Sequence, residues 1–201
     1  MNVSSFANYS IPPYSFNYTA GQKSHFPLFH FFASIFDRIN NETGPESNVQ
    51  QTDQSLAADI MILLADDDKD DRELFEEAIT EISPHITIRL VEDGFQLMDI
   101  LKDVNNPVPD ILFLDLNMPG MSGKQCLSEI KKDPRLNKLP VVIYSTSSLI
   151  NDIKDTHSIG ANLYIKKPDS FKLAISLIKK VFSIDLENLK AIPNLKNFVL
   201  S

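Results

Sequence analysis

The chain has 201 residues, of which 43% are hydrophobic and 23% charged, and its formal net charge is −8 at pH 7. This length and composition predict one globular domain with extensions, and the negative charge argues against nucleic acid or an anionic membrane as the main partner. A single cysteine, Cys126, excludes an internal disulfide. Because the sequence has neither a run of 18 apolar residues nor a secretory signal, we expect a cytoplasmic protein without a membrane span.

Residues 1–59 differ in composition from the rest of the chain. They are rich in Asn, Ser, Tyr and Phe and have no sustained period, although the aromatic stretch 25–39 is compatible with a short helix from Leu28 to Asn40. The polar residues 41–58 indicate a linker. We expect an N-terminal extension that is poorly ordered. Two alternatives stay open: the aromatic stretch packs on the domain, a partner or a membrane surface, or the natural start is Met61.

Repeats of a short apolar run followed by an amphipathic segment occupy residues 60–182. The apolar runs are typical of strands that are buried on both faces, and the segments between them show the spacing of one helix face. Because crossovers between parallel strands are right-handed, this order predicts an α/β fold with a doubly wound five-stranded parallel sheet and helices on both faces. The predicted strands are 60–65, 86–91, 110–115, 140–145 and 162–166, and the predicted helices are 70–82, 95–101, 124–132, 149–159 and 170–182.

Residues 183–201 form a tail after the last predicted helix. The tail contains Pro193 and ends in the mostly apolar residues 197–200. This pattern is compatible with a segment laid back over the domain and equally with a short partner-binding segment.

Polar and charged side chains that could take part in a reaction follow four of the predicted strands. Asp66 and Asp67 follow the first, Asp115 ends the third, Ser145 ends the fourth and Lys167 follows the fifth. Because the carboxyl ends of parallel strands meet at one edge of a sheet, we expect these side chains to lie together. Taken singly, each has a structural interpretation as a cap, a turn residue or a surface charge. Only their joint placement indicates a site.

The acids of this set predict a site for a divalent cation. Neighbouring carboxylates repel one another, and Mg²⁺ prefers oxygen ligands. We expect Asp67 and Asp115 to ligate the ion directly, Asp66 to hold a metal-bound water and the backbone carbonyl of Asn117 to supply a further oxygen.

This arrangement suits phosphoryl transfer onto a carboxylate. Asp115 is the predicted nucleophile, which would form an acyl phosphate. The ammonium of Lys167 would neutralise charge on the phosphoryl oxygens, and the Ser145 hydroxyl would donate a hydrogen bond to one of them.

Four segments of the chain together resemble the receiver domain of two-component response regulators, in particular the stand-alone, chemotaxis-regulator-like kind. These are ILLADDDKDD at 62–71, DILFLDLNMPGMSG at 110–123, PVVIYSTSS at 140–148 and ANLYIKKP at 161–168. The resemblance covers about residues 60–182 and implies a flavodoxin-like sheet of order 2-1-3-4-5.

The resemblance also assigns roles to individual residues. The matching positions are Asp115 for the phosphoacceptor, Asp66 and Asp67 for the acidic pair, Ser145 for the switch hydroxyl, Lys167 for the lysine before a proline, and Tyr164 for the switch aromatic. It implies that Ser145 moves toward the phosphoryl group and that Tyr164 rotates inward into the vacated space. The surface of the fourth helix, fifth strand and fifth helix would then change shape for a partner protein.

The partners that the resemblance implies are a sensor histidine kinase or a histidine phosphotransfer protein, and a downstream protein target. The only enzymatic activities expected are self-phosphorylation and autodephosphorylation, and no output domain is expected after the receiver. Two alternatives are a docking module that ignores phosphate and an aspartate-nucleophile phosphatase. The phosphatase would need an acid two residues after Asp115, where this chain has Asn117.

Overall fold

Five short apolar segments form parallel strands of one sheet in the computed structural model, which describes residues 60–84 and 86–200. The strands are β1 Met61–Ala65, β2 Thr87–Val91, β3 Ile111–Leu114, β4 Val141–Ser145 and β5 Leu163–Lys166. Every residue of β3 and β4 is buried, which explains why these segments are continuously apolar. The order β2-β1-β3-β4-β5 confirms the predicted doubly wound sheet.

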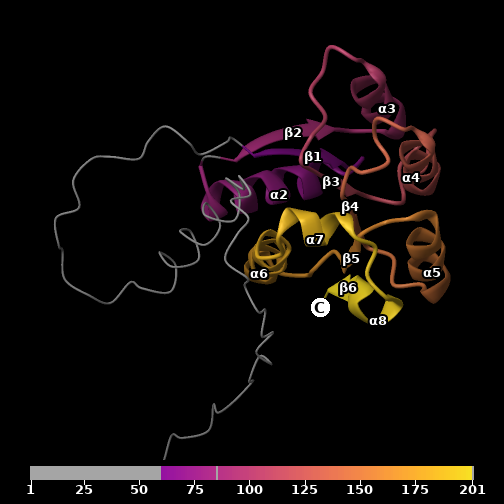
Figure 1. Cartoon of the computed structure of the whole chain (residues 1–201). Coiled ribbons are helices and arrows are strands. Elements are labelled where there is room, and N and C mark those ends of the chain that lie inside the picture. Colours follow the sequence, from indigo (N-terminus) through magenta and orange to yellow (C-terminus); the bar gives the residue numbers. More distant parts are fainter. Residues whose placement is uncertain (1–59, 85, 201) are drawn as a thin grey trace, which may run out of the picture.

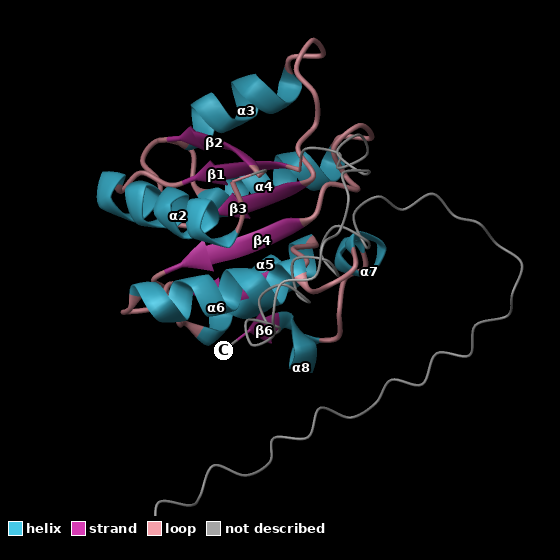
Figure 2. Ribbon diagram, turned by 90° about the vertical axis from the view of Figure 1, so that its left-hand side faces the viewer, coloured by secondary structure: helices cyan, strands magenta, loops and turns pink. Residues whose placement is uncertain are grey.

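The helices form two layers, one on each face of the sheet (Figure 1). Figure 2 views the sheet from the layer of α2 and α6, and α3, α4 and α5 cover the opposite face. Each of these helices was predicted to within one residue at either end. Their bounds are α2 Lys69–Ile82, α3 Gly94–Lys102, α4 Gly123–Lys132, α5 Ile150–Ile159 and α6 Phe171–Phe182.

The sheet separates two hydrophobic cores. Under α2 and α6, Phe75 contacts Phe113 and Tyr144 edge to face, with ring centroids 4.8 and 5.3 Å apart. Under α3, α4 and α5, the fully buried Cys126 and Leu127 pack among leucines and isoleucines, so Cys126 is a core residue as expected. Burial of a large apolar side chain contributes about 1.5–3 kcal/mol, so these cores fix the sheet edge that carries the site.

The segment after α6 adds a sixth strand, which the sequence did not predict. Its elements are α7 Leu186–Lys190, α8 Leu195–Phe198 and β6 Val199–Leu200. β6 pairs in parallel with β5, with Val199 opposite Tyr164. The tail is therefore laid back over the domain. A two-residue strand has no detectable period of its own, which is why only its partner strand could reveal it.

The predictions made for residues 1–59, including a helix from Leu28 to Asn40, fall outside the described residues. Within 60–84 and 86–200, none of the helices has the length and apolar composition needed to cross a bilayer.

Candidate functional site

Three carboxylates converge at the carboxyl end of two adjacent strands. Asp66 and Asp67 follow β1 and Asp115 follows β3, and these strands pair directly with Ala65 opposite Leu114. Each acid offers one oxygen, and the three oxygens lie within 4.8 Å of one another. Asp66 and Asp115 are buried, whereas Asp67 is exposed to solvent. The structure thus brings together the acids that the strand ends predicted.

Lys167 reaches this cluster from the end of β5. Its Nζ lies 2.7 Å from Asp66 Oδ2 and 3.5 Å from Asp115 Oδ2. Burial alone would lower the pKa of Lys167, but its close ionic contacts with Asp66 and Asp71 and the charge of Asp115 outweigh burial and raise the pKa. The lysine is therefore fully charged, and it links three strands of the sheet edge.

Asp71 is a member of the site that was not predicted from the sequence. Its Oδ2 lies 2.7 Å from Lys167 Nζ. It sits in the first turn of α2, where acids are usually explained by the helix dipole alone. The N-cap Asp68 accepts hydrogen bonds from the backbone N–H groups of Asp70 and Asp71, at 2.8 and 3.3 Å, and so sets the start of the helix. No local pattern in the sequence indicates this contact, because Lys167 lies 96 residues further along the chain.

Burial has the largest effect on the pKa of Asp66. Desolvation, opposed by Lys167, raises the pKa of this carboxyl to about 6. Its Oδ1 accepts a hydrogen bond from the Asp68 N–H at 3.1 Å. Its Oδ2 is buried and has an ionic contact with Lys167 but no hydrogen bond of good geometry. An oxygen in this situation is stabilised by a cation.

The two oxygens of Asp115 have different surroundings. Oδ1 accepts a hydrogen bond from the N–H of Leu116 at 2.6 Å, whereas Oδ2 faces Lys167. The loop from β3 to α4 folds closely over this residue, and Gly123 donates its N–H to the Leu116 carbonyl at 3.1 Å. A Cβ at Gly123 would collide with the Asp115 carbonyl oxygen, so the loop requires glycine there. Asn117 lies in this loop with an exposed side chain.

Ser145 and Tyr164 lie on the neighbouring strands. Ser145 ends β4, is fully buried, and its Oγ accepts a hydrogen bond from the N–H of Ser147 at 3.4 Å. Lys167 donates its N–H to the Ser145 carbonyl at 2.9 Å, which holds the two site residues side by side. Tyr164 on β5 is only 1% exposed, and its hydroxyl donates to the Ser147 carbonyl at 2.9 Å. The ring of Tyr164 is thus in the inward position.

The cluster fits a divalent cation. It combines three clustered carboxylate oxygens, and two of the three acids, Asp66 and Asp115, are buried. Mg²⁺ and Mn²⁺ both favour such all-oxygen ligand sets. The structure therefore brings together the three predicted acids in a cluster that suits either ion.

Comparison with known proteins identifies a family and several similar proteins. The family model described as "Response regulator receiver domain" matches residues 62–179. The response regulator Rcp1 of Synechocystis is 30% identical over 131 residues, which cover 63% of this chain and 89% of Rcp1. A crystal structure of the Mn²⁺-bound form of Rcp1 has a TM-score of 0.59 at 30% identity and covers 67% of this chain and 99% of that one.

A second solved structure is that of the phosphorylated cyanobacterial phytochrome response regulator RcpA. It has a TM-score of 0.58 at 34% identity and covers 62% of this chain and 91% of RcpA. The family match spans more than half of the sequence and includes the carboxyl ends of β1 to β5. The chain belongs to the family of response regulator receiver domains.

Proposed function

We propose that this protein is a phospho-accepting response regulator of a two-component or phosphorelay system and that Asp115 is its phosphoacceptor. The observation that carries the proposal is the position of Asp115. Its Oδ2 lies 3.5 Å from a charged lysine, inside a three-carboxylate cluster that fits a cation. The receiver domain is proposed to span residues 60–182, between an N-terminal extension, 1–59, and a C-terminal tail, 183–201.

The chemistry is a direct phosphoryl transfer. An Asp115 carboxylate oxygen bonds to phosphorus as the P–N bond of a phosphohistidine breaks, and the electron pair of that bond stays on the imidazole nitrogen. Lys167 neutralises charge on the phosphoryl oxygens, and the Ser145 hydroxyl donates a hydrogen bond to one of them. The acyl phosphate is later hydrolysed by water, so the protein turns over only its own phosphate.

A bound Mg²⁺ would be held by Asp67, Asp115 and the backbone carbonyl of Asn117, with Asp66 acting through a water. It would supply positive charge against the phosphoryl oxygens. The three clustered carboxylates and the Mn²⁺-bound form of the relative Rcp1 support this assignment.

The signal is proposed to leave through protein–protein contact. Ser145 shifts toward the phosphoryl oxygen, Tyr164 fills the space behind it, and the surface of α5, β5 and α6 is read by a target with unequal affinity for the two shapes. The phosphate donor is a sensor histidine kinase or a histidine phosphotransfer protein, in the cytoplasm where ATP sustains such donors. No observation favours a phosphatase, since the side chain two residues after Asp115 is the amide of Asn117.

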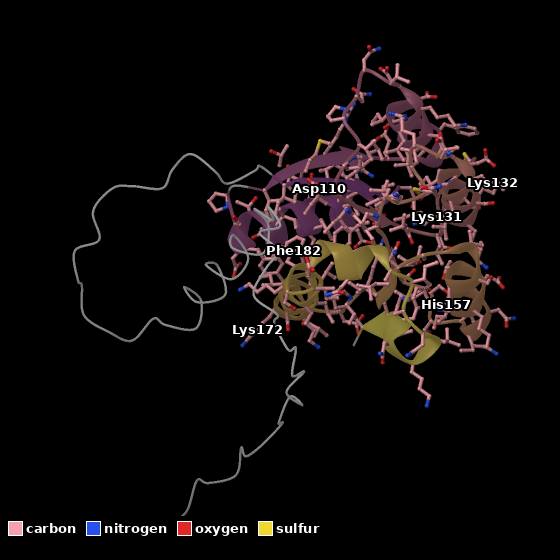
Figure 3. All side chains as sticks on the ribbon, in the orientation of Figure 1. Asp110, Lys131, Lys132, His157, Lys172 and Phe182 are labelled. Atoms are coloured by element: carbon pink, nitrogen blue, oxygen red, sulfur yellow. The ribbon has the colours of Figure 1, made fainter. Side chains whose placement is uncertain are left out.

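The test is labelling by acetyl phosphate with Mg²⁺, followed by intact mass. We expect one phosphoryl group on the wild type and none on Asp115→Asn. Asp110→Asn is a matched control because Asp110, labelled in Figure 3, lies at the opposite end of β3, where its Oδ2 accepts the Met61 N–H at 2.9 Å. Asparagine keeps that acceptor, so labelling should persist. An unlabelled wild type, or steady turnover of a phosphomonoester, would overturn the proposal.

A further inference from the structure

The C-terminal segment, defined here as residues 193–200, packs against the surface through which the signal is proposed to leave. β6 extends the sheet beyond β5, and α8 lies beside α5 (Figure 1). His157 of α5, labelled in Figure 3, donates its Nε2–H to the Pro193 carbonyl at 2.8 Å. The segment is therefore attached both to β5 and to α5.

Phe198 is the anchor of this segment. Its side chain is fully buried, and its ring contacts those of His157 and Tyr164 edge to face, with centroids 4.9 and 6.1 Å apart. It belongs to the same core as Leu127 and Ile143. A phenylalanine side chain buries a large apolar area, which stabilises packing. Docking of this short segment therefore depends on the Phe198 ring.

Tyr164 is held from three sides. Its hydroxyl donates to the Ser147 carbonyl, its backbone pairs with Val199, and its ring contacts Phe198. Because protein interiors are close-packed, the ring cannot move toward the sheet edge while Phe198 occupies that space. Outward rotation of Tyr164 therefore requires movement of the C-terminal segment.

Ser147 connects this contact to the phosphorylation site. Its N–H donates to Ser145 Oγ, its carbonyl accepts from the Tyr164 hydroxyl, and its own hydroxyl donates to Asp152 on α5. Asp152 in turn lies 2.8 Å from Lys124 of α4. A shift of Ser145 thus reaches both Tyr164 and the start of α5 through one residue.

We propose that the C-terminal segment is an intramolecular ligand of the α5–β5 surface, with Phe198 as a positioning residue that holds Tyr164 inward. Docking of the segment and phosphoryl binding at Asp115 then favour the same state, and coupling between two sites is reciprocal. This inference rests on the proposed function. It implies that a target reading this surface contacts the segment itself, whose outward side chains include the exposed Leu195 and Val199.

The first arm of the test measures phosphoryl-site affinity, with beryllofluoride and Mg²⁺ as the phosphoryl mimic. Phe198→Ala should bind the mimic about tenfold more weakly than the wild type, within the usual range of coupling between two sites. Phe198→Leu, which keeps apolar volume, should recover most of the affinity. Leu195→Ala is the matched control, because Leu195 lies in the same segment with its side chain 41% exposed, and its affinity should equal that of the wild type.

The second arm follows Tyr164 directly by fluorine NMR of fluorotyrosine-labelled protein. The chain has five tyrosines, and Tyr164→Phe identifies the relevant signal. In Phe198→Ala this signal should move toward that of a solvent-exposed ring, and hydrogen exchange of the β5 and β6 amides should accelerate by about tenfold or more.

The outcomes separate this inference from the proposed function. If the wild type does not bind the mimic, the proposed function fails, and the NMR arm alone decides whether Phe198 holds Tyr164. If the wild type binds and Phe198→Ala binds equally well with an unchanged Tyr164 signal, the segment only covers the sheet edge and the inference is wrong.

If Phe198→Ala does not fold, His157→Ala replaces it. His157→Ala removes one ring contact and the bond to Pro193, so both readouts should change in the same direction by about threefold.

Discussion

The ammonium of Lys167 lies 2.7 Å from the Oδ2 of Asp71, closer than the 3.5 Å that separates it from Asp115 Oδ2. The Asp71 side chain is 33% exposed and stands at the rim of the site, in the first turn of α2. Asp71 therefore competes with Asp115, the proposed phosphoacceptor, for the ammonium of Lys167. It also places a negative charge near the path of an incoming anionic phosphoryl donor.

Replacing Asp71 by Asn should speed labelling by acetyl phosphate. Removal of one charge frees Lys167 to move toward Asp115 and reduces repulsion of the donor. A partly exposed ion pair is worth about 0.2–1 kcal/mol, so the rate should rise by at most about fivefold. Asp70→Asn is the matched control, since Asp70 lies in the same turn but has no observed contact with Lys167. Equal rates in the two variants would show that the Asp71 contact has no influence.

The raised pKa of Asp66 predicts how stability depends on pH in the absence of divalent metal. The folded state holds this proton up to about pH 6, whereas the ordinary value is 3.8. The associated stability is therefore fully present below about pH 3.8 and is lost as pH rises through about 6. At pH 7 the ionised, buried Asp66 lowers stability by an amount on the order of 3 kcal/mol.

Asp66→Asn should accordingly raise the free energy of unfolding at pH 7 and change it little at pH 4. Urea denaturation in a chelator at both pH values measures this difference. Addition of Mg²⁺ should stabilise the wild type at pH 7 and stabilise the variant much less, because a ligand that binds only the folded state shifts the equilibrium. A variant that loses stability at pH 7 would contradict the desolvation account.

Replacing Ser145 by Ala should separate labelling from its structural consequence. The hydroxyl accepts one long hydrogen bond, from the Ser147 N–H, so its loss should cost only about 1 kcal/mol of stability. Asp115 and Lys167 keep their positions and labelling should continue. Hydrogen exchange of residues 146–150 should then change far less on labelling than in the wild type. An undiminished exchange response would rule out coupling through Ser145.

Gly123→Ala should damage both the fold and the site. The added Cβ would meet the backbone carbonyl of Asp115, which cannot move aside without breaking the pairing of β3. We expect a loss of more than about 2 kcal/mol in stability and a large drop in labelling. Gly120→Ala provides the comparison. Its φ of 74° also disfavours alanine, but its Cβ would meet the ring of Phe95, which is 60% exposed and can move.

Much of this protein follows from local patterns in its sequence. Apolar runs such as Ile111–Leu114 predict buried strands, because they are continuously apolar and too short for a buried helix. Parallel strands then bring the residues after them to one edge, so the sequence pattern already predicts that Asp66, Asp115 and Lys167 lie together.

Other features depend on contacts between distant segments and have no local signature. The ion pair of Asp71 requires the length and direction of the Lys167 side chain across 96 residues of sequence. The sixth strand exists only because β5 offers an open edge to two residues. The inward position of Tyr164 depends in turn on Phe198.

The amino-acid sequence was enough to predict the first five strands, the two helix layers and the members of the acidic cluster, because those follow from periodicity and from the rule that strand ends share an edge. The sixth strand, the partners of Lys167, the burial of each carboxylate and the docking of the C-terminal segment became evident only in the folded protein. These depend on side-chain packing and desolvation, which arise when segments far apart in the chain come within a few ångströms of one another.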